Sequence, residues 1–538
     1  MKTLKTAFVV ALVSASPLTD SSAYAQEGLP TTYWTVNTSG IAEFAAGVAV
    51  GADSRPVVAD TVCSTFGASG CQSRAVKYNS DTGAAVWTFV DSASGPDAMA
   101  EAGGVAIGAD GNPVMAFTQC DSFGGNCAIV AVKLNGTTGA QIWRRASTVG
   151  TTFDFAKGVA IGPDGHPVVV GATCSADNSS CQGKVFKANG STGVVIFNVT
   201  RGTNYQMLYG VAVPLSSSNP FVTGVQCAAT SQSCNIVTSQ LSATTGAQVS
   251  TTTYNAGEPL GYFSEIGWGV RLGTDDLPVM TGVTCLAAGC DFRTIKYTSA
   301  TMGTVSWNQL YNSGGANMDA ALGGDIAIAN DNRSVITGSS CTVDYPNCVG
   351  RIRKLNTTGA VMWDVLDGGA TTALQSVATG PDANPVVAGY ECTGDLCSTR
   401  ISKRVLQYTT GTGSTVIVAI NGDRNVADGA RVTFPTVTTA GTTQMVTTSS
   451  GPAPPSGITF LGARYFRFST TATASTSPTV CLNYGNIMSG TESQYELYRR
   501  NNANTAWVQV TTSQSTANNR ICGSAASQGL GLYAIGRP

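Results

Sequence analysis

Histidine is almost absent from this chain, because His166 is the only one in 538 residues. Catalysis by Ser-His-Asp or Cys-His groups needs an imidazole as general base. His166 lies in PDGHP, where two similar phrases have Asn112 and Asn384, so we interpret it as a turn residue. The sequence also lacks a G-x-S-x-G elbow and a Walker-type loop. These absences argue against histidine-based hydrolysis and favour a role other than catalysis.

Charged residues are scarce as well. The chain has 30 Lys and Arg against 32 Asp and Glu, a share of 12% and a formal net charge of −2. A nucleic-acid-binding protein is expected to carry a basic patch, so we expect no nucleic-acid partner. Beyond the N-terminus no run approaches the ~18 to 20 apolar residues that cross a bilayer. The sequence therefore predicts no transmembrane segment in the mature chain.

The N-terminus has the order of an export signal. Lys2 and Lys5 precede the apolar run AFVVALV, and the small-x-small stretch AYA ends at residue 25. This order predicts a signal peptide over residues 1–25, with cleavage before Gln26; the alternative is a short buried strand or helix. We expect an exported protein in the periplasm, at the cell surface or outside the cell.

One phrase recurs along the chain: an apolar run, a turn and a second apolar run. Its seven copies are GVAVGADSRPVVAD from residue 47, GVAIGADGNPVMAF from 104, GVAIGPDGHPVVVG from 158, GVAVPLSSSNPFVTG from 210, GVRLGTDDLPVMTG from 269, DIAIANDNRSVITG from 325 and SVATGPDANPVVAG from 376. Each copy is followed by a pair of cysteines and a strand such as AIVAVKLN. After six copies, a Thr-Gly turn then leads into a strand that often carries Trp. Turn formers such as ADGN between apolar runs predict tight hairpins, so each repeat is expected to hold four short strands.

The fourth strand of the seventh repeat is missing at its expected place. TYWTVNTSG at residues 32–40 resembles it, and Trp34 lies 13 residues before Gly47, as Trp363 lies 13 before Ser376. Repeats of 51 to 59 residues match the period of a propeller blade. We predict an all-β chain with a seven-bladed β-propeller over residues 31–410, closed by the N-terminal strand; an open array is the alternative. Closure leaves fewer exposed sheet edges.

The repeats resemble two known families. GVAIGADGNPVM is similar to the bacterial SBBP-type β-propeller repeat, and KLNGTTGAQIW is similar to the Thr-Gly-x-x-x-Trp strand of PQQ-like (quinoprotein-like) propellers. The resemblance implies a fold and says little about chemistry, since such repeats serve scaffolds, binders and enzymes. PQQ-dependent dehydrogenases typically have eight blades and an adjacent Cys-Cys pair. This chain has seven copies and no Cys-Cys, so we expect no cofactor.

The 16 cysteines give the strongest signal, because each has a partner. One pair follows each copy of the phrase: Cys63 and Cys71, Cys120 and Cys127, Cys174 and Cys181, Cys227 and Cys234, Cys285 and Cys290, Cys341 and Cys348, and Cys392 and Cys397. Cys481 and Cys522 are left in the C-terminal region. An even count in an exported chain predicts disulfides. Metal or haem ligation is not expected, since no Cys-x-x-Cys is present and histidine is nearly absent.

Aromatic residues gather between repeats two and five, in segments that we predict to be loops on the same face as the disulfide loops. They are Phe153, Phe155, Tyr205, Tyr209, Tyr262, Phe263 and Trp268. Such residues could form a ligand-binding platform; packing between blades is the alternative.

Acidic residues in the same predicted loops are the only candidates for catalysis. They are Asp97, Glu101, Asp154, Glu258, Glu265 and Asp319. A glycosidase-like pair of carboxylates needs no further motif. An enzyme that acts on a polysaccharide or a small molecule is thus an alternative function.

Residues 411–538 lose the repeat and hold short β-rich runs separated by turns such as SGPAPPSG, which predict a β-sandwich domain. The order of its phrases resembles a module at the C-terminal end of many bacterial secreted repeat proteins. From the whole sequence we expect a secreted or cell-surface binding protein whose ligand is a glycan or a protein. An envelope scaffold is a further alternative, and the sequence leaves the oligomeric state undetermined.

Overall fold

The computed structural model describes residues 27–538. The predicted signal peptide, residues 1–25, lies outside the described residues. So do the internal segments 41, 65–69, 92–98, 122–125, 148–152, 176–178, 203–204, 230–231, 256–264, 287–288, 313–317, 343–346, 422–428, 486–489, 502 and 526–529. The described chain is built of strands and two 3₁₀ turns, Glu492–Gln494 and Thr516–Asn518, which confirms the all-β prediction. None of its helices is long and apolar enough to cross a membrane.

The repeats fold into seven antiparallel units of four strands. Unit 1 holds β2 (Ala42–Val50), β3 (Pro56–Cys63), β4 (Gln72–Tyr78) and β5 (Ala85–Asp91). Unit 2 holds β6 (Met99–Ile107), β7 (Pro113–Cys120), β8 (Cys127–Leu134) and β9 (Gln141–Ala146). Unit 3 holds β10 (Phe153–Ile161), β11 (Pro167–Cys174), β12 (Cys181–Ala188) and β13 (Val195–Arg201). Unit 4 holds β14 (Tyr205–Ala212), β15 (Phe221–Ala229), β16 (Gln232–Leu241) and β17 (Gln248–Tyr254). Unit 5 holds β18 (Glu265–Leu272), β19 (Pro278–Leu286), β20 (Gly289–Tyr297) and β21 (Val305–Tyr311). Unit 6 holds β22 (Met318–Ile328), β23 (Ser334–Cys341), β24 (Cys348–Leu355) and β25 (Val361–Asp367). Unit 7 holds β26 (Thr372–Thr379), β27 (Pro385–Thr393), β28 (Leu396–Val405) and, as its fourth strand, β1 (Thr31–Asn37).

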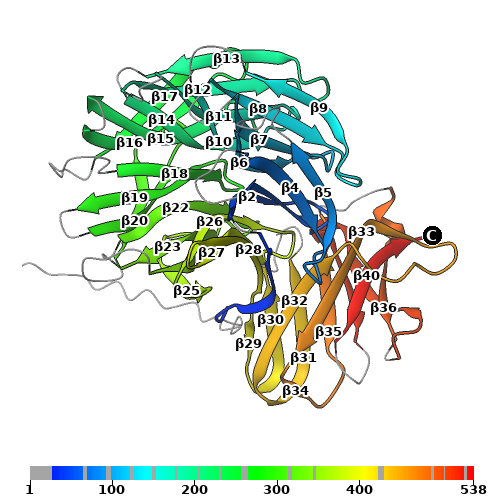
Figure 1. The fold of residues 1–538 in the computed structure, drawn as a ribbon. Coiled ribbons are helices and arrows are strands. Elements are labelled where there is room, and N and C mark those ends of the chain that lie inside the picture. The colour runs from blue at the N-terminus through cyan, green and yellow to red at the C-terminus, as the bar shows by residue number, and fades with distance from the viewer. Residues whose placement is uncertain are drawn as a thin grey trace, which may run out of the picture.

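The units follow one another around a common centre (Figure 1). The first strands of successive units are in contact, and β26 of unit 7 is in contact with β2 of unit 1. Parallel pairing links a first strand to the unit before it: Phe153 pairs with Cys127, and Ala42 of unit 1 pairs with Cys397 of unit 7. Strand β1 pairs antiparallel with β28, as the spacing of Trp34 predicts.

Units 1, 2 and 7 are each tied to the next unit by a lysine on the third strand and a tryptophan opposite it on the fourth. In unit 1, Lys77 Nζ and Trp87 Nε1 both donate to the carbonyl oxygen of Gly136, at 2.8 and 3.2 Å. Gly136 lies in the Thr-Gly turn of unit 2. The turn glycine, Gly139, has a φ of +74°, and a Cβ on it would lie 2.8 Å from the Trp87 ring. The Thr-Gly phrase therefore provides both a left-handed turn and a surface for the preceding tryptophan.

The same arrangement recurs in units 2 and 7. Lys133 and Trp143 of unit 2 donate to the Gly190 carbonyl of unit 3, at 2.8 and 3.0 Å. Trp34 of unit 7 donates to the Ser80 carbonyl of unit 1, at 3.0 Å. These units thus satisfy buried donors with an acceptor from the next one, which fixes the spacing of the units.

Unit 6 lacks such an acceptor, because the third and fourth strands of unit 7 are not joined by a turn. Glu27, just ahead of β1, takes its place. Its carboxylate accepts from Lys354 Nζ and Trp363 Nε1, each at 2.8 Å, and lies 3.3 Å from Arg333 Nη1. The side chains of Glu27 and Lys354 are 1% and 0% exposed. The segment before β1 therefore completes the contact between units 6 and 7.

All eight predicted disulfides are present, which confirms the cysteine pairing. Seven lie in the repeats: Cys63–Cys71, Cys120–Cys127, Cys174–Cys181, Cys227–Cys234, Cys285–Cys290, Cys341–Cys348 and Cys392–Cys397. The eighth joins Cys481 to Cys522, which are 41 residues apart. This number of disulfides indicates an oxidising extracellular or periplasmic environment.

Six of the seven repeat bridges link the second strand of their unit to the start of the third. Cys120 and Cys127 are directly opposed in the β7–β8 pair, and Cys290 of β20 is opposed to Cys285 of β19 in the same way. Cys71 is placed differently, because it lies directly before β4 and not within it. Its bridge to Cys63 spans 8 residues, against 5 or 7 in the other repeats.

The C-terminal region forms two six-stranded sheets. One holds β29 (Tyr408–Thr410), β32 (Gly441–Thr448), β33 (Thr459–Thr470), β40 (Leu532–Arg537), β36 (Glu496–Arg500) and β37 (Trp507–Gln509). The other holds β30 (Gly413–Ile420), β31 (Ala430–Thr439), β35 (Thr479–Asn483), β39 (Arg520–Ser524), β38 (Thr511–Ser515) and β34 (Thr473–Ala474). Buried residues of both sheets, such as Phe434 and Phe466, belong to one apolar cluster.

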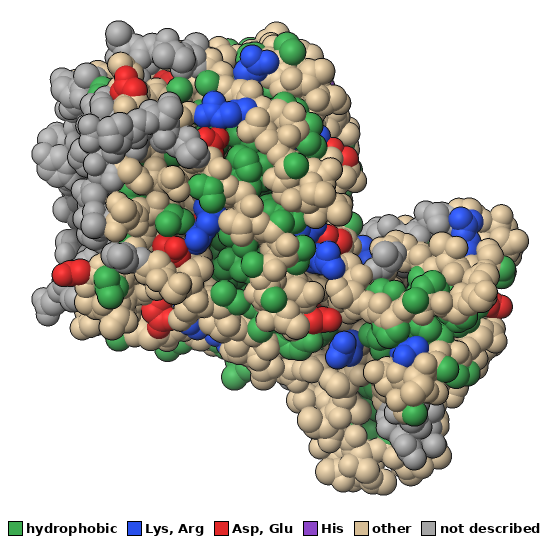
Figure 2. Space-filling model, turned by 45° about the vertical axis from the view of Figure 1, so that its right-hand side comes forward, with side chains coloured by type: hydrophobic (Ala, Val, Ile, Leu, Met, Phe, Trp, Pro, Cys, Tyr) green, Lys and Arg blue, Asp and Glu red, His purple; other side chains and the backbone are tan. Residues whose placement is uncertain are grey.

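That cluster does not stop at the C-terminal region. It continues into units 6 and 7 through Trp363, Leu374 and Val387. Polar contacts reinforce the junction, since the Asp382 carboxylate accepts from the Thr447 amide at 3.1 Å. The C-terminal region projects from the repeats in Figure 2, where the few charged side chains of both signs are interspersed on the visible face.

Candidate functional site

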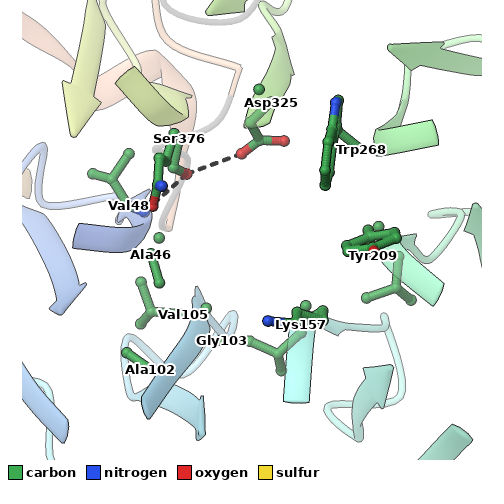
Figure 3. Close-up of a pocket in the computed structure, with 18 of the residues that line it drawn as sticks. Ala46, Val48, Ala102, Gly103, Val105, Lys157, Tyr209, Trp268, Asp325 and Ser376 are labelled. Atoms are coloured by element: carbon green, nitrogen blue, oxygen red, sulfur yellow. Dashed lines mark hydrogen bonds between the residues drawn. The ribbon is translucent and has the colours of Figure 1, made fainter. Parts of the chain in front are cut away.

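The first strands share an irregularity that builds a site at the centre of the units. In all seven the pairing register with the second strand shifts, and in six of them the shift leaves one extra residue as a β-bulge. The extra residues are Ala46, Gly103, Lys157, Tyr209, Trp268 and Gln375. All six line a cavity of about 230 Å³ (Figure 3). One bulge per strand therefore places residues from six units around one space.

The residue after each bulge sits where neighbouring first strands meet. It is glycine in units 1 to 5, and a Cβ on Gly47 would lie 2.8 Å from the Gly104 Cα. Units 6 and 7 have Asp325 and Ser376 there instead. Ser376 Oγ donates to Asp325 Oδ2 at 2.9 Å and accepts from the Val48 amide at 3.1 Å (Figure 3). A hydrogen-bonded chain thus runs from unit 6 through unit 7 to unit 1.

The structure corrects the predicted position of the aromatic residues. Phe153 and Phe155 lie in β10, Tyr205 and Tyr209 in β14, and Trp268 in β18, so these five lie in first strands and not in loops. The first strands begin several residues before the Gly-Val phrase, because they pair with the second strand as far as its cysteine. Tyr262 and Phe263 lie outside the described residues.

The five aromatic side chains are half-buried. The Tyr209 and Trp268 rings meet edge to face at 4.8 Å, and both line the cavity. Phe153, Phe155 and Tyr205 pack against the Cys174–Cys181 bridge. Burial, with a smaller contribution from Tyr205, raises the pKa of Tyr209, so its hydroxyl stays protonated at neutral pH.

Two ion pairs bring charge to the cavity. Lys157 Nζ lies 3.4 Å from a Glu101 carboxylate oxygen, and Arg271 Nη2 lies 3.1 Å from Asp325 Oδ2. The sequence interpretation did not select Lys157, Arg271, Asp325 or Gln375. Aligning the seven phrases would have shown the varying residue before each repeated glycine, but not that the varying residues meet.

The acidic residues are also corrected, because those that the structure describes lie in strands. Asp154, Glu265 and Asp319 lie in β10, β18 and β22 and are 1%, 3% and 0% exposed. Asp154 accepts from Ser147 Oγ at 3.1 Å. Among the described candidates, only Glu101 of β6 lines the cavity. The structure therefore does not bring two of them together there.

Asp97 and Glu258 lie outside the described residues. His166 has the position of Asn112: its Nδ1 accepts from the Gly190 amide at 3.1 Å, and Asn112 Oδ1 accepts from the Gly136 amide at 2.8 Å. In the part of the chain that is described, no cluster of three or more His, Cys, Asp or Glu could hold a metal ion.

No family model matches the sequence, and no curated protein matches it. Among solved structures, a quinohemoprotein alcohol dehydrogenase from Comamonas testosteroni is 10% identical with a TM-score of 0.37, covering 70% of this chain and 76% of that one. A protein of unknown function from Dyadobacter fermentans is 9% identical with a TM-score of 0.41, covering 70% of this chain and 98% of that one. At such low scores these similarities carry no conclusion about ligand or chemistry.

Proposed function

We propose that this chain is an exported, carbohydrate-binding protein, built as a closed seven-bladed β-propeller over residues 31–410, whose last strand β29 joins the sheet of a β-sandwich over residues 411–538. Three contacts between the two ends of the repeat region support closure. Strand β1 pairs with β28, Ala42 pairs with Cys397, and the Val48 amide donates to Ser376. The predicted signal peptide and the eight disulfides support export.

The bulge residues of units 3 to 5 carry the proposed function. Tyr209 and Trp268 present half-buried aromatic surface to the cavity, and Lys157 lies beside them on the same ring of positions. Sugars have apolar C–H faces and hydroxyl edges, so they need both kinds of partner. Gln375 and Glu101 add an amide and a carboxylate.

The scaffold suits recognition without large movement. Tyr205 packs against the Cys174–Cys181 and Cys227–Cys234 bridges, and Trp268 belongs to the same apolar cluster as Cys285 and Cys290. Side chains held in this way lose little freedom when a ligand binds, which favours affinity.

A glycan array probed with the oxidised protein tests the proposal. The wild type should bind a defined set of glycans, and Trp268→Ala should lower the affinity for them about tenfold, because the lost ring contact is worth about 1.4 kcal/mol. Phe89→Ala is the matched control, since Phe89 is a half-buried aromatic on the outer strand β5. Equal binding by both variants would contradict the proposal.

A further inference from the structure

One residue near the centre departs from the repeat. The position two residues after the start of the phrase is arginine in unit 5, Arg271, and alanine in the other six units. The alanines are Ala49, Ala106, Ala160, Ala212, Ala327 and Ala378. Arg271 lies opposite Val279 of the second strand. Each alanine lies opposite the equivalent residue of its own second strand, so all seven positions share one register.

Arg271 lies where two cavities meet. The first is the cavity of the bulge residues. The second, of about 410 Å³, continues along the first strands and is lined largely by apolar residues such as Ile107 and Ile161. Both share Arg271 with a set of valines: Val48, Val105, Val159 and Val211. The long side chain thus occupies the boundary that alanine leaves open in the other units.

The guanidinium is held in place by its neighbours. Arg271 Nη1 donates to the Val270 carbonyl at 2.9 Å, and Nη2 donates to Asp325 Oδ2 at 3.1 Å. Asp325 in turn accepts from the Ile326 amide and from Ser376 Oγ, at 2.8 and 2.9 Å. The Arg271 side chain remains 35% exposed, so a positioned cation with further N–H groups faces the cavity.

Resting on the proposed function, we infer that the cavity binds the end of an acidic oligosaccharide, and that Arg271 recognises the carboxylate of its terminal uronate. Arg271 follows Trp268 by three residues on β18. A sugar ring against Trp268 and Tyr209 therefore places a ring substituent towards the guanidinium, whose planar fork matches a carboxylate.

Lys157 supplies a second cation to the same cavity. Its contact with Glu101 is long, at 3.4 Å, and both side chains are partly exposed, at 29% and 43%. A pair with this exposure contributes little stability, so Lys157 can exchange Glu101 for a ligand carboxylate at small cost. Asp325, with its three donors, stays in its structural role.

The shape explains why the chain end is recognised. A cavity of about 230 Å³ is smaller than the about 300 to 1,000 Å³ of sites for drug-sized ligands, and it suits one terminal residue. Beyond Arg271 the second cavity is lined by apolar side chains together with polar groups such as Thr274 and Asp276, so the small volume of the first cavity limits how much of the sugar chain it holds. The remaining sugar residues then extend outwards along Phe153, Phe155 and Tyr205.

Calorimetric titration with trigalacturonate and with neutral trigalactose tests the inference. The wild type should bind the acidic trisaccharide about tenfold more tightly, and salt should reduce this preference. Arg271→Ala restores the residue of the other six units and should abolish the preference, because trigalacturonate loses the guanidinium that trigalactose does not need. Arg271→Lys keeps the charge without the fork and should retain part of the preference. Thermal unfolding checks that both variants fold.

The outcomes separate this inference from the proposed function. Binding of both sugars with an acidic preference that survives Arg271→Ala would overturn the inference alone, as would binding of trigalactose with no preference for trigalacturonate. Absence of binding to any sugar, on the array and in solution, would overturn both. Both would also be overturned if the protein bound no sugar but bound a tripeptide with a free C-terminus and not the same tripeptide with an amidated C-terminus.

Discussion

The early repeats and the closing end of the molecule use the same donors against different acceptors. In unit 2, Lys133 and Trp143 donate to a backbone carbonyl, Gly190 O. In unit 6, Lys354 and Trp363 donate to a carboxylate, Glu27. The carbonyl comes from a turn that joins two strands of the next unit. Unit 7 borrows its fourth strand from the N-terminal part of the chain, so the residue ahead of that strand supplies the acceptor.

This difference changes the energetics of the junction. The Gly190 carbonyl is an uncharged acceptor, and the charge of Lys133 is compensated by a second partner, Asp110, which is 46% exposed. Glu27 and Lys354 form a buried pair, so each compensates a charge that water cannot reach. The closing end is therefore expected to depend on single residues more strongly than the early repeats do.

Removing Glu27 is expected to have the largest effect. Glu27→Ala leaves Lys354 buried without its carboxylate and should lower the free energy of unfolding by about 3 to 5 kcal/mol. Asp110→Ala, the matched change in unit 2, should cost at most about 1 kcal/mol, because Lys133 keeps the Gly190 carbonyl. Urea unfolding measures both. Similar losses would contradict the comparison, and adding Lys354→Met to Glu27→Ala should recover part of the loss.

The disulfides extend the comparison to the C-terminal region. Chain-entropy arguments give about 4 kcal/mol for the bridge Cys481–Cys522, which closes 41 residues, and about 2.5 kcal/mol for Cys120–Cys127, which closes 7. Replacing each pair by alanines and measuring unfolding should reproduce this order. A larger loss from the bridge in unit 2 would show that its local packing outweighs loop length.

Replacing the tryptophans by phenylalanine removes the indole donor and so compares the two acceptors directly. Trp363→Phe removes a bond to a carboxylate and should cost about 1.5 to 3 kcal/mol, whereas Trp143→Phe removes a bond to a carbonyl that keeps Lys133 and should cost about 1 kcal/mol. Unit 3 already has Phe197 at this position, opposite Lys187. Thermal and chemical unfolding compare the two variants, and equal losses would mean that the charge of Glu27 adds nothing to this bond.

The smallest expected effect concerns a turn aspartate and depends on pH. Burial raises the pKa of Asp164, but hydrogen bonds from Lys187 and the His166 amide outweigh burial and leave the pKa below its usual value. The unfolded chain therefore takes up the proton first as pH falls. Asp164→Asn should cost about 0.5 to 1 kcal/mol at pH 7. The cost should fade below pH ~4, the unfolded value, and vanish once pH falls below the folded pKa.

Parallel unfolding curves at pH 7 and pH 3 measure that difference. The control is Asn189→Ala in the Thr-Gly turn of unit 3, which removes an acceptor for the Ser191 and Thr192 amides, changes no charge and should shift stability equally at both values. A loss from Asp164→Asn that persists at pH 3 would show that the ion pair with Lys187 is not its cause.

Predictions from the sequence were correct for the local features of the repeats and wrong where a bulge breaks the alternation of side chains along a strand. The cysteine pairs of the repeats lie within a few residues of each other, so their pairing follows from hairpin geometry, and all were correct. Phe153 and Tyr205 were misplaced into loops because each first strand continues beyond the repeated phrase. The bulges at Lys157, Tyr209 and Trp268 could not be read from alternation, since an extra residue shifts which side chains share a face.

What the sequence determined by itself is the order of strands and turns and the pairing of the cysteines, because hairpins, turns and short disulfides depend on neighbouring residues. Only the tertiary structure decided which residues meet at the centre and at the closing end. Lys157, Trp268 and Asp325 come from different units, and Glu27 meets Lys354 across 327 positions of the chain. Such contacts arise from the packing of whole units around a common centre, and no local pattern encodes them.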